Sequence, residues 1–407
     1  MLKYITQNGI YAFLVILLLM SEIIGVLPKT GFALPVAFLL VLLKTQGRMG
    51  MNVTIVLFVI IAAASIIFGD PLPFYKSWYR LGYFILMLLG MSPLITSKSL
   101  NQVRFQMFEW LMKFSVFIGT ISVFCYFIGI NYNSLDIRTD EASLNGIFGG
   151  ITRSSMYLGP LSSLAFCYLL YLWIQKKRDR KNILRWHYAA MFCSLASCLL
   201  AASRIALASL VAAVIFMVFY CYKTHLVRKQ YFILLLGILG LFLISSGYFA
   251  SGIIMKQQNN IQSGSMYSSR EVKWSQRIAE IKEHPFFGVG FAAQLKTRPV
   301  DRLTLKTGVV EPGSGWGAIG GMTGLLGLWA MLALFVSMFR KSCYLIRKEN
   351  TIGVLYGSLL IFFAFHFIGE GYVLAAGSPL SWMFWLLLGT ISSTYSHYLQ
   401  KQPYRHV

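Results

Sequence analysis

Charge is scarce in this 407-residue sequence, and acidic residues are the scarcest. Only 12% of the residues are charged, with 14 acidic and 36 basic side chains, whereas an ordinary soluble domain contains roughly 25%. A soluble chain of this length would form two or three domains with polar surfaces. So few charges could not cover those surfaces, and the composition therefore excludes a soluble protein.

Motifs for common cofactors are also missing. No GxxxxGK[ST] loop is present to hold nucleotide phosphates, so ATP-driven chemistry is not expected. No histidines and cysteines have the spacing of a metal site, and we predict neither a metal nor another cofactor. The six cysteines lie in or beside apolar runs and are predicted to be packing residues rather than disulfide partners. No internal repeat is found, which argues against a transporter built from inverted repeats.

Long apolar runs are abundant. Hydrophobic residues make up 57% of the chain, and runs of about 17–22 residues, long enough for a helix to cross a bilayer, recur from end to end. We expect an all-α fold, a polytopic membrane bundle of about 12 transmembrane helices. The first run is expected to be a retained helix and not a signal peptide. The expected spans are residues 9–27, 31–44, 51–69, 81–96, 110–130, 156–175, 188–203, 205–222, 231–250, 317–339, 352–369 and 380–396.

The basic residues predict the orientation. With the N-terminus in the cytoplasm, the inside loops contain 20 lysines and arginines, Arg104 among them, and the short outside loops contain six. This bias follows the positive-inside rule and accounts for most of the net charge of +22. Both termini are therefore expected in the cytoplasm, and nucleic acid is not an expected partner.

One long outside loop, residues 251–316, separates helices one to nine (1–250) from helices ten to twelve (317–407). It carries nine basic and five acidic residues. A basic surface outside the membrane suits an anionic ligand such as a phosphate or a pyrophosphate.

Part of this loop is predicted to be a helix. Ser268 and Glu271 have capping-box spacing, and Pro285 follows the expected end near Glu283. The helix dipole disfavours an arginine in the first turn by about 0.3–1 kcal/mol, and a bound anion would remove that cost. Four residues share one face of the helix: Arg270, Trp274, Arg277 and Ile281.

Arg204 lies between two apolar runs, at the outer membrane boundary. An arginine there is costly unless it reaches water or is paired. Its planar guanidinium could bind a phosphate through two parallel hydrogen bonds. Alternatively, the side chain could extend from the helix end to water. Arg270 and Arg277 have two comparable interpretations, an anion site or an ordinary solvated helix face.

Two further places carry candidate residues. Residues 311–316, Glu-Pro-Gly-Ser-Gly-Trp, form an irregular start to the tenth span, where Glu311 is either a general base or a carboxylate at the rim. His366 and Glu370 lie near the outer end of the eleventh span. Ionisable residues there are functional candidates, although two residues four positions apart can also pair with each other.

Several segments occur in an order that resembles a known family. Arg153 precedes the sixth span, and AASRIALASL (201–210) joins two helices. The long loop contains SSREVKWSQRIAEIKEHPFFGVGF (268–291), and SGWGAIGGMTGLLGLWAML (314–332) begins the tenth span. The Ser-Arg pair, the Arg–x3–Trp helix followed by Pro–x2–Gly–x–Gly, and the Gly-Leu-Leu-Gly run resemble the bacterial O-antigen polymerase and O-antigen ligase superfamily.

The resemblance implies a function. Family members take an undecaprenyl-pyrophosphate-linked oligosaccharide as donor and transfer the glycan to a sugar hydroxyl with inversion, without a metal, at the periplasmic face of the inner membrane. Arg204 and Arg270 would hold the pyrophosphate leaving group. Membrane lipid and a polysaccharide chain-length regulator are implied partners. Further substrate-binding residues are predicted to be Arg153, Trp274, Arg277, Ser314, His366 and Glu370.

One position departs from the ligases. In them a histidine followed by asparagine stands about eleven residues before the Gly-Leu-Leu-Gly run, whereas here Gly313 and Ser314 precede the run that starts at Gly324. The missing histidine favours a polymerase, with Glu311 first and Glu370 second as the candidate base. We predict a metal-independent inverting glycosyltransferase that polymerises the repeat units of a surface polysaccharide. A ligase, a multi-pass polysaccharide or lipid transporter and a non-enzymatic scaffold are the alternatives.

Overall fold

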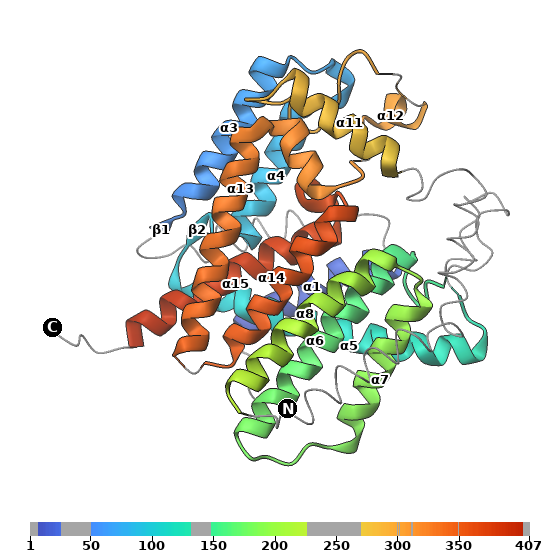
Figure 1. Cartoon of the computed structure of the whole chain (residues 1–407), viewed down its shortest axis with the longest axis vertical. Coiled ribbons are helices and arrows are strands. Elements are labelled where there is room, and N and C mark those ends of the chain that lie inside the picture. Colours follow the sequence, from blue (N-terminus) through green and yellow to red (C-terminus); the bar gives the residue numbers. More distant parts are fainter. Residues whose placement is uncertain are drawn as a thin grey trace.

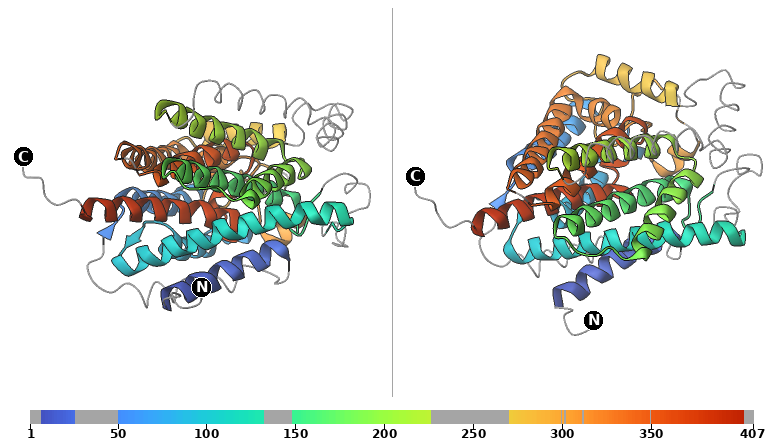
Figure 2. Two further views of the ribbon diagram at one scale, coloured as in Figure 1. Left: turned by 90° about the horizontal axis from the view of Figure 1, so that it is seen from below. Right: turned by 60° about the horizontal axis from the view of Figure 1, so that its bottom comes forward.

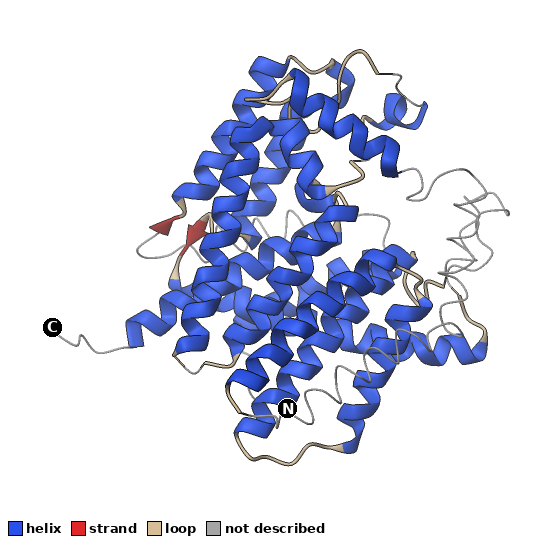
Figure 3. Ribbon diagram, in the orientation of Figure 1, coloured by secondary structure: helices blue, strands red, loops and turns tan. Residues whose placement is uncertain are grey.

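The computed structural model describes residues 7–25, 50–131, 148–225, 270–298, 300, 302–310, 312–348 and 350–401. These residues form a bundle of helices (Figures 1 and 3), and Figure 2 shows the long helices running along roughly one direction. A two-residue strand pair, β1 with β2, is antiparallel. The elements are α1 (Gln7–Ile24), β1 (Gly50–Met51), α3 (Val53–Gly69), η2 (Pro73–Tyr75), α4 (Ser77–Met91), β2 (Ile95–Thr96), α5 (Lys98–Ile128), α6 (Ser155–Arg178), α7 (Arg185–Leu200), α8 (Arg204–Lys223), α11 (Arg270–Glu283), α12 (Arg302–Thr307), α13 (Gly315–Arg347), α14 (Ile352–Gly369), η5 (Tyr372–Leu374) and α15 (Pro379–Lys401).

The all-α architecture agrees with the apolar runs in the sequence. Ten of the twelve expected spans coincide with described helices, and the other two, 31–44 and 231–250, lie outside the described residues. Five described helices are long and apolar enough to cross a membrane: α5, α6, α8, α13 and α14. The count of about 12 spans and the division at residues 250 and 316 stay predictions.

The α4–α5 region differs from the expectation. The span expected at 110–130 belongs to a helix that begins at Lys98, because Ser97 accepts a hydrogen bond from the Leu100 N–H as its N-cap. Arg104, expected in a cytoplasmic loop, is instead fully buried. Its guanidinium donates to the carbonyl oxygens of Gly90 (2.9 Å), Ile95 (2.8 Å) and Leu89 (2.9 Å). It therefore satisfies carbonyls at and beyond the end of α4, which have no partner within that helix.

Packing fixes the direction of the helices around α14. The start of α6 meets the start of α8, because a Cβ on Gly159 would lie 2.9 Å from the Ser203 Cβ. The other end of α6 lies beside the start of α14, where Gln175 and Ile352 line one cavity. Hence α8 runs antiparallel to α14, and the first residue of α8 lies at the end of the bundle where α14 finishes.

An aromatic cluster joins α14 to α15. The rings of Phe367 and Phe384 lie 4.9 Å apart, and those of Phe384 and Trp385 lie 5.3 Å apart. All three side chains are almost fully buried. Edge-to-face pairs of this kind add roughly 0.5–1.5 kcal/mol beyond the burial of their area, and they pack the C-terminal end of α14 against α15.

Candidate functional site

Helix α11 lies directly on the first turns of α13, where glycines replace side chains. A Cβ on Gly317 would stand 3.2 Å from the Arg277 Cβ, and one on Gly320 would stand 2.7 Å from the Ile281 Cδ1. At Gly321 it would collide with the Glu280 carboxylate. The Gly-rich start of the tenth span is therefore the surface on which the loop helix packs, and this surface at Gly317, Gly320 and Gly321 is called the α11 seat below. The expected end of that helix is confirmed, since α11 ends at Glu283, two residues before Pro285. The cap expected at Ser268 lies outside the described residues.

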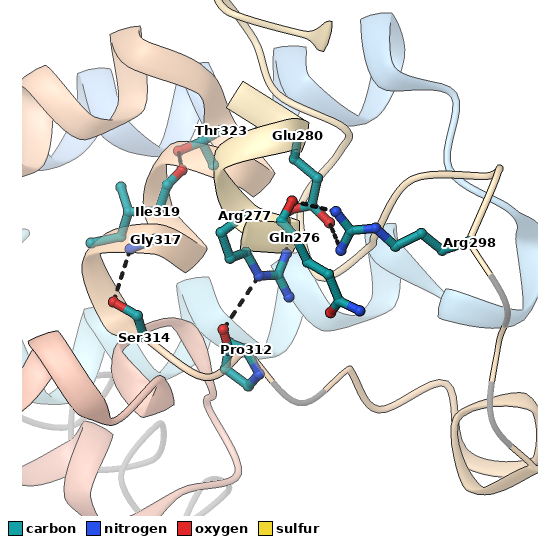
Figure 4. A network of polar contacts seen from close by, with 9 residues as sticks. All are labelled: Gln276, Arg277, Glu280, Arg298, Pro312, Ser314, Gly317, Ile319 and Thr323. Atoms are coloured by element: carbon teal, nitrogen blue, oxygen red, sulfur yellow. Dashed lines mark hydrogen bonds and ion pairs between the residues drawn. The ribbon is translucent and has the colours of Figure 1, made fainter. Parts of the chain in front are cut away.

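A buried charge network fixes α11 on this seat (Figure 4). Arg277 is 3% exposed and donates to the Glu280 carboxylate at 2.6 Å and to the Pro312 carbonyl at 3.3 Å. Arg298, from the loop that follows, donates to the other Glu280 oxygen at 3.2 Å and to the Gln276 carbonyl. Because one carboxylate serves two guanidinium groups, the network keeps a net positive charge.

Tyr75 borders this network. Its side chain is fully buried, and burial, with a smaller contribution from the negative charge of Glu280, raises the pKa of its phenol. Burial also lowers the pKa of Arg298, which Glu280 counteracts. Tyr75 is therefore a neutral phenol at neutral pH.

The Pro285–Gly290 turn fills a break in α13. At Gly324 the backbone leaves helical geometry, with φ at 70° and ψ at −174°. The Val289 and Gly290 N–H groups donate to the Gly321 carbonyl at 2.9 Å and the Met322 carbonyl at 3.2 Å. The Leu325 N–H donates to the Pro285 carbonyl at 2.7 Å. These bonds satisfy the backbone groups that the break frees, as membrane-embedded backbone requires.

Gly288 and Gly324 are the positions where this fit needs glycine. Gly288 has φ of +72°, and a Cβ there would stand 2.5 Å from the Gly321 carbonyl oxygen. A Cβ on Gly324 would overlap the Phe286 carbonyl. The Pro–x2–Gly–x–Gly and Gly-Leu-Leu-Gly motifs are thus two halves of one contact, which ties the loop to the tenth span.

Ser314 links the start of α13 to the end of α14. Its hydroxyl donates to the Phe367 carbonyl at 3.0 Å and accepts from the Gly317 N–H at 3.2 Å as the N-cap of α13. Ser314 is 7% exposed, so in this state its hydroxyl serves packing between helices. Pro312 also contacts Gly371, just beyond α14.

His366 and Glu370 lie where α14 ends. The His366 ring is buried, stacks on Phe362 and shares a hydrogen bond of 2.8 Å between its Nδ1 and the Tyr372 hydroxyl. Glu370 is the C-cap of α14, and its backbone N–H donates to the His366 carbonyl. The structure thus gives His366 a tyrosine partner that the sequence analysis did not consider.

Arg153 and Arg204 lie at the same end of the bundle. Arg204 is the first residue of α8, half-buried, and follows Ser203, whose hydroxyl accepts from the Ala206 N–H. Arg153 precedes α6 and its N–H donates to the Ile23 carbonyl at the end of α1. Since α6 and α8 begin side by side, these two arginines flank neighbouring helix starts.

Arg204 lies at the same end of the bundle as the α11 seat. A Cβ on Gly357 of α14 would stand 2.8 Å from Phe216 of α8. Arg204 lies twelve residues before Phe216 in α8, and Gly369 lies twelve residues after Gly357 in α14. Because the two helices are antiparallel, the N-terminus of α8 and the C-terminus of α14 both lie about 18 Å from the contact, in the same direction. Ser314 and Pro312 join this end of α14 to α11 through Arg277. Arg204 and Arg277 therefore belong to one face of the molecule.

Some predicted residues are placed only in part. Arg270 is the first residue of α11, and its side chain lies outside the described part of the structure, as does the whole of Glu311. Trp274 lies half-buried on α11. The catalytic role of Arg204, Arg270 and Glu311 and the substrate-binding role of the other candidates stay predictions.

Sequence reasoning missed Glu280 and Arg298. Glu280 lies three residues after Arg277, a spacing at which opposite charges meet on a helix, so the pair could have been found. Arg298 joins from 18 residues further along the chain, and no local pattern indicates that contact.

Comparison with known proteins agrees with the motifs. Residues 189–332 match the sequence model of the family described as O-antigen ligase. This region starts in α7, includes Arg204 and the whole of α11, and ends in α13. No curated protein matches the chain. The resemblance to the O-antigen polymerase and ligase superfamily is therefore confirmed over residues 189–332.

Proposed function

We propose that this protein is a surface-polysaccharide polymerase of the O-antigen type. It would move a growing glycan from one undecaprenyl-pyrophosphate carrier onto the terminal sugar of a second lipid-linked repeat unit, at the periplasmic face of the bacterial inner membrane. The supporting observation is the seating of α11 on α13 at the same end of the bundle as Arg204.

The leaving group is the reason for arginine at this face. The bond between the anomeric carbon and the pyrophosphate oxygen breaks, a bond from that carbon to the acceptor oxygen forms, and negative charge builds on the departing pyrophosphate. Fixed positive groups stabilise such charge more in a site of low polarity than in water. Arg204 and Arg270 each occupy the first position of a helix, where the helix dipole itself favours an anion.

The buried network has a different part in this proposal. Arg277 and Arg298 are tied to Glu280 and to backbone carbonyls, so they hold α11 in place and add a net positive charge behind the site. Arg270 would then begin a helix whose position is fixed. Fixed geometry matters because misplacing a catalytic group by about 1 Å can cost on the order of 100-fold in rate.

A proton must leave the acceptor hydroxyl as the new bond forms. Glu311 and Glu370 are the candidate acceptors of this proton. They belong to touching segments, because Pro312 follows Glu311 and contacts Gly371, which follows Glu370. Either carboxylate would work without a metal.

The geometry at Gly313 favours polymerase over ligase. This is the position where the resemblance places the histidine of the ligases. Its φ is +70°, and a Cβ there would stand 2.6 Å from the Lys273 Cβ of α11. A histidine would need an unfavourable backbone conformation and would displace α11. A ligase that hands the glycan to lipid A core is the second candidate, and a chain-length regulator is the proposed partner.

Purified protein in lipid vesicles tests the chemistry. The vesicles would contain a lipid-linked repeat unit as the sole substrate, and products would be separated by mass. Polymers with released polyprenyl pyrophosphate are expected, in a metal-chelating buffer as well. Turnover that needs added lipid A core would contradict the polymerase and support the ligase.

A further inference from the structure

A second site lies at the opposite end of the bundle from α11. A cavity of about 1280 Å³ opens between α5, α6, α14 and α15. Its mouth is near the C-terminal ends of α6 and α15, whereas the candidate active site is at the N-terminal end of α13. The basic loops that predict the cytoplasmic side surround it, so the cavity faces the cytoplasm.

One face of α5 runs down the cavity wall. Lys98, Gln102, Phe105 and Glu109 line it at positions i, i+4, i+7 and i+11, which share one side of a helix. At 1.5 Å per residue, Glu109 lies about 16 Å from Lys98 along the axis. Lys98 is exposed at the mouth, so the cavity runs along the N-terminal part of α5, up to the start of the span expected at 110–130.

Glu109 is the notable residue at the deep end. It belongs to a helix apolar enough to cross a membrane, and within the described part of the chain it forms no ion pair. Tyr168 and Tyr171 of α6 line the same cavity and lie close enough to Glu109 to feel its charge. A carboxylate that lines a cavity at the start of an expected membrane span is a candidate for ligand binding.

Neutral hydrogen-bonding groups cover much of the remaining wall. Gln102, Gln175, Asn350 and Thr394 line it. The buried Asn101 Oδ1 has no hydrogen-bond partner among the described residues, which is unusual for a buried polar atom. The wall therefore offers amides, hydroxyls, aromatic faces and one carboxylate, a combination that suits a ligand with many hydroxyl groups.

The mouth carries the opposite charge to Glu109. Lys98 and His397 are exposed there. The basic run Lys176–Lys181 directly follows the lining residue Gln175, and Lys348 lies two positions before the lining residue Asn350. This rim repels a free cation and attracts an anion. A ligand that matches both ends has a phosphate at the mouth and a neutral polyhydroxyl group inside.

We propose that this cavity binds a glycosyl phosphate from the cytoplasmic side, with the sugar hydroxyls toward Glu109 and the phosphate at Lys98. Its source is either a water-soluble sugar phosphate or nucleotide sugar, or a lipid-linked sugar phosphate in the inner leaflet. This binding does not depend on the polymerase proposal, because the two sites lie at opposite ends of the bundle.

Binding to the purified full-length protein tests the proposal. The probes are glucose 1-phosphate, UDP-glucose and a short-chain polyprenyl phosphoglucose, with glucose and inorganic phosphate as fragments. At least one whole glycosyl phosphate should bind about tenfold or more tighter than either fragment. Tight binding of only the polyprenyl probe would identify a lipid-linked sugar phosphate as the ligand. Tight binding of the soluble probes would identify a water-soluble sugar phosphate or nucleotide sugar.

Variants locate the site. Glu109→Gln and Tyr168→Phe should weaken binding by about tenfold each, whereas exposed Glu283→Gln and exposed Tyr188→Phe should leave it unchanged. Lys98→Gln should weaken the binding of glycosyl phosphates and leave the binding of glucose unchanged. Inorganic phosphate binding as tightly as every glycosyl phosphate would reduce the cavity to an anion site and overturn the proposal. So would unchanged binding in all three cavity variants, or no binding of any probe by protein whose melting temperature is normal.

Discussion

Arg104 and Arg277 are both buried arginines, at opposite ends of the bundle, and they differ in their partners. Arg104 donates only to neutral backbone carbonyls. Arg277 shares the Glu280 carboxylate with Arg298. The first arrangement supplies hydrogen-bond donors to the carbonyl groups at the end of α4. The second holds α11, the helix of the long loop, in position and leaves a net positive charge beside it. Burial alone therefore does not make an arginine a site candidate, and its partners and the charge that they leave must be compared.

Arg104→Ala should have the largest effect of the predicted changes. It would leave three buried carbonyl oxygens without a donor, at a cost of about 1–3 kcal/mol each. We expect little folded protein in the membrane, measured by fluorescence-detected size exclusion. Exposed Arg340→Ala is the matched control and should express normally. Normal yield of a monodisperse Arg104→Ala protein would show that the carbonyls find other partners.

Arg204→Ala and Arg270→Ala should each abolish long chains while the protein stays in the membrane. Loss of a group that stabilises the leaving pyrophosphate should reduce turnover about 100-fold or more. The measurement is chain length on a glycan gel beside an immunoblot of membranes. The lysine variants should recover part of the activity, because they keep the charge but lose the planar fork. Wild-type chain length in both alanine variants would remove these arginines from the mechanism.

Glu280→Gln should be milder than loss of Arg204. The amide keeps one acceptor but loses the charge that two arginines share, which should cost about 2 kcal/mol at the α11 seat. We expect faster proteolysis of the segment around α11 and reduced turnover, with little change in overall expression. Exposed Glu283→Gln on the same helix is the control. Equal protease resistance in both variants would mean that the glycine seat alone holds α11.

Ser314→Ala should have the smallest effect. It removes an N-cap and the bond to the Phe367 carbonyl, at a cost of about 1 kcal/mol. The melting temperature of the purified protein should fall by a few degrees, with activity nearly unchanged. A large loss of activity at normal stability would instead support the prediction that Ser314 contacts substrate.

Local signals in the sequence predicted much of this structure. Pro285 predicted the end of α11, and the apolar runs predicted the helices that begin at Arg204 and directly after Ser314. The Gly-Leu-Leu-Gly run that starts at Gly324 was recognised as a motif, but the fit of Gly317, Gly320 and Gly321 to α11 depends on tertiary contact. Arg104 was placed wrongly in a loop because its carbonyl partners lie in α4 and β2. The Glu280–Arg298 pair was missed because the chain that separates its members has no regular pattern.

The central claim is polymerisation, and the most direct test is the surface glycolipid of the source bacterium after deletion of this gene. A polymerase predicts core that carries a single repeat unit, with the ladder of longer chains lost and restored by the wild-type gene but not by Arg204→Ala. Bare core with long chains accumulating on the polyprenyl carrier would contradict this account and identify a ligase.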